Sequence, residues 1–433
     1  MKIAFFLFNG SLGNVDWNTV DESNPGVGGT EYLFVLNAYL LSKRKEVEIV
    51  LYTEQDNQFP QGMHVVSGLD AHSAIIDAAN KNTDFFVIKE FDYLVNEKVL
   101  ENTPSSIGIV LWTHIFVSVK RLNYYAKIPN LKSIIMVGRE QLDLYRGHPL
   151  FEKMDYIYNG CTFPPKSLLS KELQPVSNRD NIVTYIGSLV PFKGFHVLAK
   201  AWPMILKSVP DAQLYVIGTG KLYDRNARLG SFGIASEEYE AKFMKFLTDK
   251  EGKIIPSVHF MGRLGLEKND ILKKTKVGVP NPLSKTETFG LGAIEMQTFG
   301  CCVVTSQSCG YLDTVVHKKN LYRFPWAICL ASKVIRNLRS PNFDFDHAYD
   351  EMKSKFDAHD IATQWVHLFY SLSQGKCRIH NLDYVPNRFY RLKWLRVLMQ
   401  RVNSRIHYTM PCLLALTETR VYNKILHYYR KLY

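Results

Sequence analysis

The chain has 433 residues, 46% of them hydrophobic and 22% charged, which is the composition of an ordinary globular protein with two or three domains that each bury a core. No run approaches the roughly 18 apolar residues of a membrane span, and the first apolar run, Ile3–Phe8, is too short for a signal peptide, so we expect a cytoplasmic protein. The formal net charge is +12, and residues 375–433 alone carry +10, so a nearly neutral body is followed by a basic appendage.

The first part of the chain alternates apolar runs of strand type with helical patterns. A long polar loop to Pro25 follows the run Ile3–Phe8, and the pattern of Thr30–Ser42 predicts a helix. The further strands that we expect here are Val47–Tyr52, Phe85–Ile88, Ile107–Trp112 and Ser133–Val137. Near-continuous apolar strands between helices indicate a parallel sheet with both faces covered.

The turn-rich segment Tyr156–Pro165 is expected to end the first domain, because the same pattern restarts after it. The second series has strands at Ile182–Ile186, Leu214–Ile217, Val258–Phe260, Val277–Val279 and Cys302–Thr305, with helices at Phe195–Val209 and Gly290–Gly300. Two such series predict an α/β protein with two Rossmann-like, doubly wound domains, residues 1–165 and 166–360, facing each other across a ligand cleft at the carboxyl ends of their strands. Residues 361–375 are expected to form a helix that closes the second domain or crosses back to the first.

The segment Lys285–Glu295, KTETFGLGAIE, places two carboxylates on either side of a glycine turn into a helix. The first amide groups of that helix, at Phe289–Leu291, have no partner within the helix and suit a phosphate. Glu295, one turn further on, is placed to accept the two hydroxyl hydrogen bonds that a ribose offers, and Glu287 precedes the turn. The alternative is a capped helix with two solvated acids, and the spacing alone leaves both interpretations open.

This segment resembles the E-x7-E signature of the family-four retaining glycosyltransferases, which have the GT-B fold. Five other segments resemble that family's motifs in the same order: Gly28–Glu31, Tyr158–Gly160, Gly187–Gly194, Val216–Gly220 and Val258–Gly262. The resemblance covers roughly residues 1–375. Each motif is weak by itself, and their order is what makes the resemblance specific.

The resemblance implies a donor site in the second domain. Glu287 would contact the hydroxyl groups of the donor sugar, Glu295 the ribose, and Lys193 the diphosphate. The other donor-binding candidates are Gly28, Gly29, Ser188, Gly218, Arg263, Leu264, Thr288, Phe289, Gly290 and Leu291. Ser188 stands where the family often has an arginine, so Lys193 and the helix start are expected to balance the diphosphate charge.

Three further candidates lie in the first domain. His114 follows a predicted strand, where the family commonly has a histidine near the donor sugar, and we group it with Glu287 and Lys193 as a catalytic candidate. A lone histidine is otherwise most often structural. Glu31 and Arg139 are assigned to the acceptor side. Arg139 follows the next strand and suits an acceptor phosphate, and the alternative is that it meets the donor.

The implied reaction is transfer of a hexose-type sugar from a UDP- or GDP-sugar to a glycan or lipid-linked acceptor, as in polysaccharide, lipopolysaccharide or glycolipid assembly. Retention by front-side attack is implied, without a metal or other cofactor, and the one DxD sequence, Asp344–Asp346, is interpreted as a loop outside the donor motifs. The alternatives are a non-catalytic GT-B scaffold at a membrane assembly, or another GT-B chemistry such as a sugar-nucleotide epimerase or a phosphorylase.

The appendage, residues 376–433, mixes apolar, aromatic and basic residues. Asn387–Asn403 has apolar residues at helical spacing with arginines between them, and Tyr422–Tyr433 repeats the mixture. Such a helix can lie in the headgroup layer of an anionic membrane, so residues 387–433 are assigned to an inner membrane surface. The alternatives are packing on the body and a partner interface. Nucleic-acid binding is not expected, because the body is nearly neutral.

Overall fold

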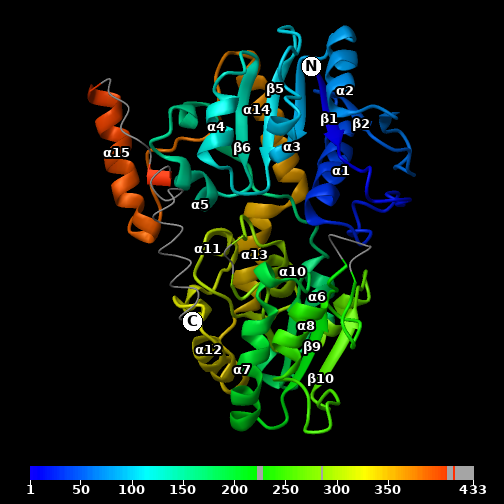
Figure 1. Cartoon of the computed structure of the whole chain (residues 1–433), viewed down its shortest axis with the longest axis vertical. Coiled ribbons are helices and arrows are strands. Elements are labelled where there is room, and N and C mark those ends of the chain that lie inside the picture. Colours follow the sequence, from blue (N-terminus) through cyan, green and yellow to red (C-terminus); the bar gives the residue numbers. More distant parts are fainter. Residues whose placement is uncertain (222–227, 284–285, 407–412, 415–433) are drawn as a thin grey trace. The chain divides into compact units, whose positions relative to one another are not determined.

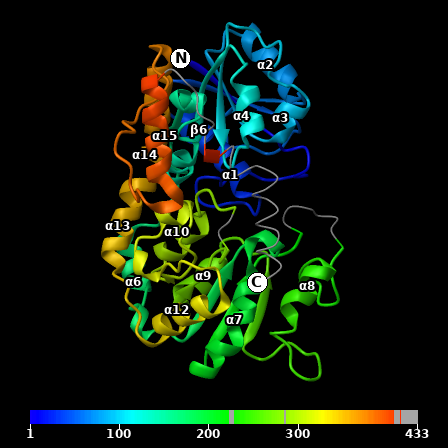
Figure 2. The same ribbon diagram turned by 60° about the vertical axis from the view of Figure 1, so that its left-hand side comes forward.

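The computed structural model describes residues 1–221, 228–283, 286–406 and 413–414 (Figures 1 and 2). The chain divides into two compact units. The first unit comprises residues 1–18, 33–158 and 359–433, and the second comprises residues 19–32 and 159–358. The segment Thr19–Tyr32, which the sequence placed in the first domain, therefore groups with the second unit. Residues Tyr422–Tyr433, assigned above to a membrane surface, lie outside the described residues.

The first unit is built on one parallel sheet with the strand order β3-β2-β1-β4-β5-β6-β7. Its strands are β1 (Lys2–Leu7), β2 (Glu48–Thr53), β3 (His64–Ser67), β4 (Phe85–Lys89), β5 (Gly108–Thr113), β6 (Leu131–Met136) and β7 (Met154–Tyr156). All six residues of β5 are buried, because helices cover both faces of a parallel sheet. The predicted parallel α/β sheet is confirmed, while the outer strands β3 and β7 were not predicted.

The helices of this unit are α1 (Gly29–Ser42), α2 (Ala71–Asn80), α3 (Asp92–Asn96), α4 (Val119–Tyr125), α5 (Arg139–Leu142), α14 (Ala358–Ser373) and α15 (Lys393–Ile406), with short 3₁₀ turns η1 (Asp143–Tyr145), η2 (Pro149–Lys153) and η6 (Tyr390–Leu392). Trp365 of α14 packs edge-on against Trp112 of β5, with 4.9 Å between the ring centroids. Of the two places expected for this late helix, the structure shows the crossing back to the first unit.

The second unit has a parallel sheet with the order β10-β9-β8-β11-β12. Its strands are β8 (Ile182–Ile186), β9 (Gln213–Ile217), β10 (Val258–Gly262), β11 (Val277–Gly278) and β12 (Cys302–Val303). Its helices are α6 (Lys166–Glu172), α7 (Phe195–Ser208), α8 (Glu237–Met244), α9 (Lys268–Lys274), α10 (Leu291–Thr298), α11 (Gly310–Thr314), α12 (Ala327–Arg339) and α13 (Phe345–Phe356), with η3 (Val176–Asn178), η4 (Pro191–Lys193) and η5 (Lys318–Asn320). Two parallel α/β sheets confirm the predicted fold class.

Parallel strands bring their carboxyl ends to one edge, and the loops after β8, β9 and β10 meet there. The Gly187 amide donates to the Ile217 carbonyl at 3.0 Å, and the Gly218 amide donates to the Gly262 carbonyl at 2.7 Å. This edge holds three of the predicted site loops. Among the described residues, no helix combines the length and the hydropathy that crossing a membrane requires.

Candidate active site

An ion pair joins two of the predicted site residues across 94 positions of sequence. Lys193 Nζ lies 2.9 Å from Glu287 Oε2, and the two side chains are 19% and 17% exposed. The backbone at Gly194, φ +73°, lets the chain turn from η4 into α7, and a Cβ there would lie 2.9 Å from the Leu283 amide nitrogen. A glycine is therefore needed to bring Lys193 beside the segment that precedes Glu287.

The Glu287 carboxylate is held in its charged form. Burial opposes ionisation, but the Lys193 ammonium and hydrogen bonds from Lys193, Asn281 and the Gly290 amide outweigh it, so the pKa of Glu287 lies below its ordinary value. Asn281 Nδ2 donates to Glu287 Oε2 at 3.3 Å. An ionised carboxylate of this kind accepts hydrogen bonds, as from sugar hydroxyls, and does not serve as a proton donor near neutral pH.

Helix α10 begins at Leu291, four residues after Glu287, at a turn that only glycine allows. Gly290 has φ +96°, and a Cβ there would lie 2.5 Å from the Tyr311 ring. Phe289 is buried and packs edge-on against Phe356, so its side chain belongs to the core and its backbone remains the group of interest. Thr288 is also buried. Leu291 opens the helix, whose first amides lie at the positive end of the dipole.

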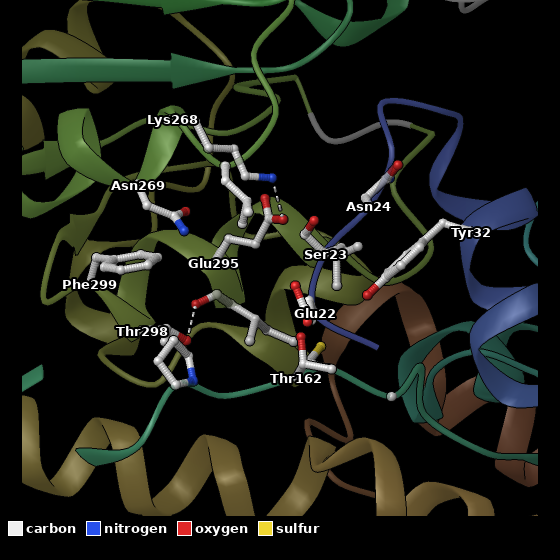
Figure 3. Close-up of a pocket in the computed structure, with 16 residues that line it drawn as sticks. Glu22, Ser23, Asn24, Tyr32, Thr162, Lys268, Asn269, Glu295, Thr298 and Phe299 are labelled. Carbon is white, nitrogen blue, oxygen red and sulfur yellow. Dashed lines mark hydrogen bonds and ion pairs between the residues drawn. The ribbon is translucent and has the colours of Figure 1, made fainter. Parts of the chain in front are cut away.

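Glu295, in the middle of α10, pairs with a lysine that the sequence did not single out. Lys268 Nζ, at the start of α9, donates to Glu295 Oε1 at 2.9 Å. Figure 3 shows this pair at a cavity of about 100 Å³, to which Asn24, Tyr32 and Thr162 also contribute. The signal for Lys268 is weak, because Glu267–Asp270 looks like a solvated charge run at a helix start.

The predicted base-pocket residues lie on the loops after β9 and β10. Gly218 has φ +144°, and a Cβ there would come within 1.9 Å of the Gly187 carbonyl oxygen, so the two loops touch backbone to backbone. Arg263 is exposed, Leu264 is half-buried, and Arg263 Nη1 donates to the Gly26 carbonyl at 3.3 Å. Arg263 therefore ties the early glycine loop to the second unit.

Ser188 is buried in the loop after β8. Its hydroxyl donates to the Thr219 carbonyl at 3.3 Å, and this bond ties the loop after β8 to the loop after β9. Its contact with a donor stays a prediction.

Side-chain hydrogen bonds fix the conformation of the early glycine loop, residues 26–29. Asn24 Oδ1 accepts hydrogen bonds from the amides of Gly26 and Val27, both at 2.9 Å. A Cβ at Gly28 would lie 2.3 Å from Glu31 Oε2, so the glycine gives room to a side chain that folds back over the start of α1. Gly29, the first residue of α1, has open space around its Cα. The contacts of Gly28, Gly29 and Glu31 with substrates stay predictions.

His114 and Arg139 lie in the first unit. His114 is buried beside Phe34 and Trp112, and this burial, with a smaller contribution from Lys89, lowers its pKa well below the ordinary value, so the imidazole is neutral. Arg139 donates to the carbonyl groups of Leu382 and Tyr384 in the C-terminal segment. Arg139 thus holds that segment in this structure, and its contact with an acceptor stays a prediction.

The two carboxylates of the DxD sequence have ordinary structural roles. Asp344 caps α13 by accepting from the His347 amide at 3.0 Å, and Asp346 pairs with Lys166 at 3.0 Å. The sequence therefore forms the start of α13 (Phe345–Phe356), and the predicted loop is wrong.

Residues 170–351 match the family model described as glycosyl transferases group 1. They form a glycosyltransferase domain. The matched range contains Lys193, Glu287, Glu295 and Lys268, and it lies within the second unit. The finer assignment to family four stays a prediction.

Two curated relatives have weak similarity to the chain. A GDP-mannose-dependent monoacylated alpha-(1-6)-phosphatidylinositol monomannoside mannosyltransferase of Corynebacterium glutamicum is 25% identical over 177 residues, 38% of this chain and 38% of that protein. An uncharacterized glycosyltransferase of Haemophilus influenzae is 26% identical over 223 residues, 50% of this chain and 55% of that protein. The chain thus matches only about a third to a half of the length of these relatives.

Solved structures share the fold over most of the chain. The Anabaena protein HepE, in complex with UDP and glucose, superposes with a TM-score of 0.58 at 16% identity and covers 86% of this chain and 100% of its own. Sucrose-phosphate synthase from Thermosynechococcus elongatus superposes with a TM-score of 0.59 at 16% identity, covering 86% and 99%. At this identity the likeness shows the fold, which is that of GT-B glycosyltransferases.

Proposed function

We propose that the chain transfers a sugar from a UDP- or GDP-sugar to a glycan or lipid-linked acceptor, with retention of the anomeric configuration. The observation that carries the proposal is the ion pair of Lys193 and Glu287 immediately before the start of α10. A cation and a helix start suit a diphosphate, and an ionised carboxylate close to them suits the hydroxyl groups of the attached sugar. The relative named for GDP-mannose and the fold neighbour solved with UDP support the two nucleotides.

The proposed chemistry breaks the bond between the anomeric carbon and the diphosphate and forms a bond from an acceptor hydroxyl on the same face. The acceptor proton moves to the departing diphosphate oxygen. Lys193 and the first amides of α10 stabilise the charge that develops there, and Glu287 orients the sugar through its hydroxyl groups. These groups need no metal ion for the role that we assign to them.

Glu295 is proposed to hold the ribose of the donor. Lys268 occupies one carboxylate oxygen at 2.9 Å, and a carboxylate has further lone pairs for two hydroxyl groups. The ion pair fixes the carboxylate against the cavity in Figure 3 before the donor arrives, which reduces the rotamer freedom lost on binding. Lys268 is thus a positioning residue for Glu295.

We propose that the acceptor binds on the first unit. Glycan and lipid-linked acceptors are both compatible with the site, and the Corynebacterium relative is named for a lipid-linked acceptor. We place the protein in the cytoplasm, peripheral to the inner face of a membrane, with the C-terminal segment as the contact. Nucleic acid is not among the proposed partners.

The test is a transfer screen with the full chain. UDP- and GDP-sugars are incubated with lipid-linked and soluble glycan acceptors, products are detected by mass spectrometry, and proton NMR reports the new anomeric configuration. A product with the donor's configuration supports the proposal, whereas an inverted product refutes the mechanism. Donor binding without any transfer, or epimerised nucleotide-sugar as the product, would favour the scaffold or the epimerase.

A further inference from the structure

The C-terminal helix α15 turns two of its cations toward the body of the first unit. Lys393 is completely buried, with its ammonium 2.6 Å from Glu140 Oε2 and 3.2 Å from Asp143 Oδ2. It also donates to the Pro386 carbonyl at 2.9 Å. Arg396, one turn later, is buried as well. Basic residues of an amphipathic helix normally face solvent, but these two face the protein, beside the buried Val397.

Further contacts fix the helix in this orientation. Arg146 Nη1 donates to Gln400 Oε1 of α15 at 2.9 Å, and Arg146 Nη2 donates to the Leu382 carbonyl at 2.7 Å. Asn387 Nδ2 donates to Glu140 Oε1 at 3.0 Å. Rotating the helix would take the Lys393 ammonium away from the buried Glu140 carboxylate, which is strongly unfavourable, although Asp143 would keep Arg146 at 2.7 Å. The basic residues therefore decide which face points outward.

The outward face carries large apolar side chains. Trp394 and Leu398, one helical turn apart, are 44% and 50% exposed, and Leu392 and Phe389 just before the helix are exposed too. Figures 1 and 2 show α15 beside the sheet of the first unit, at its margin. Single exposed apolar residues are common on protein surfaces, whereas several that lie together mark an interaction surface.

Exposed arginines border this apolar patch. Arg388 adjoins Phe389, and Arg401 and Arg405 continue the stripe of Trp394 and Leu398 along α15. Acidic side chains are scarce, since Asp383 is the one acidic residue among residues 375–406. An apolar centre with an arginine border is complementary to a surface that has acyl chains below a layer of negative phosphates.

We propose that the outward face of α15 docks on an anionic membrane surface. Trp394, Leu398, Leu392 and Phe389 enter the boundary between headgroups and acyl chains, and Arg388, Arg401 and Arg405 contact lipid phosphates. Lys393 and Arg396 face the protein and anchor the helix to it. This deepens the proposed function by naming the surface that contacts the membrane, and docking requires no nucleotide-sugar, so it is measured independently of transfer.

The test is co-sedimentation of the full chain with vesicles of equal parts phosphatidylcholine and phosphatidylglycerol. The double change Trp394→Ser with Leu398→Ser is expected to reduce the partition coefficient by about tenfold or more, because it removes the inserted apolar area. The matched control is Trp326→Ser with Ile328→Ser, another exposed aromatic and aliphatic pair, in the second unit, which is expected to leave pelleting unchanged.

The charge border is tested in the same assay. The double change Arg388→Gln with Arg405→Gln is expected to weaken binding to the anionic vesicles. Added salt should weaken the binding of the unsubstituted chain in the same way. Light scattering during gel filtration reports whether the apolar face instead joins two copies of the chain. Equal pelleting of the Trp394/Leu398 variant and its control, or a dimer that this variant dissociates without any change in pelleting, would overturn the proposal.

Discussion

Each unit holds a lysine against carboxylates, and the difference between the two clusters lies in their exposure. In the second unit, Lys193 and Glu287 keep about a fifth of their side-chain surface in solvent, beside a helix start. In the first unit, Lys393 is sealed between Glu140 and Asp143. A half-open pair can exchange its partner for a ligand, whereas a sealed pair can only hold segments together. We therefore propose that the partly exposed pair serves binding and that the buried cluster serves architecture.

The largest expected effect is the loss of the sealed cluster. Lys393→Ala removes the ammonium that faces the buried Glu140 carboxylate, while Asp143 keeps Arg146 at 2.7 Å, and we expect the free energy of unfolding to fall by about 3–5 kcal/mol. Urea unfolding followed by circular dichroism measures it. Lys253→Ala, which removes an exposed cation of the second unit, is the control and should change stability by less than about 0.5 kcal/mol. A Lys393 variant as stable as this control would contradict the claim that the buried cluster stabilises the first unit.

Lys193→Ala should leave the fold intact and remove activity. Losing a cation that faces the departing diphosphate is expected to lower kcat/KM for transfer by about 10²–10³, with little change in melting temperature. Steady-state kinetics and thermal unfolding of the same preparation measure the two effects. The comparison fails if the variant unfolds early but the folded fraction transfers sugar at the normal rate.

Features of the fold and of the candidate site could be predicted from the sequence where the residues that form them are close together in one motif. The parallel strands and the turn into α10 were predicted, because apolar runs and glycine spacing are local signals. The Lys285–Glu295 segment correctly located the start of α10, although Lys285 lies outside the described residues. Local patterns therefore found the sheet edge and the turn into α10.

The missed features are set by contacts between distant residues. The inward face of α15 follows from Glu140 and Asp143, some 250 residues earlier, and helical periodicity alone treats Lys393 as a solvent-facing cation. The pairing of Lys268 with Glu295, and the grouping of Thr19–Tyr32 with the second unit, likewise depend on how loops after separate strands meet. No pattern within either segment encodes these partners.

Lys268→Ala tests a second partly exposed ion pair of the second unit, that of Lys268 with Glu295. Glu295 remains but loses its fixed orientation, so we expect KM for the nucleotide-sugar to rise by about tenfold with kcat nearly unchanged. Lys268→Arg should restore most of the affinity, because the cation is kept. A fall in kcat with normal KM would mean that Lys268 acts on the reacting atoms instead.

The smallest effect concerns a buried carboxylate of the first unit. Burial, opposed by Arg121 and by a hydrogen bond from Tyr125, raises the pKa of Glu90 to about 7. The native state therefore retains a proton that the unfolded chain releases between pH 4.5 and about 7, so stability falls as pH rises through that window and then levels off.

Glu90→Gln removes this titration and keeps an acceptor for Tyr125, so its stability relative to the unsubstituted chain should rise with pH across the same window. Urea midpoints at several pH values measure the difference. A difference independent of pH would show that Glu90 is ionised in the folded protein throughout.

Calorimetric titration of UDP and GDP tests the central claim most directly, that the edge carrying Lys193, Glu287 and Glu295 is a nucleotide-sugar site. We predict saturable binding of one of the two nucleotides to the full chain, weakened at least tenfold by Glu295→Ala and by Lys193→Ala in folded protein. Binding of neither nucleotide, or equal binding by the chain and both variants, would contradict it.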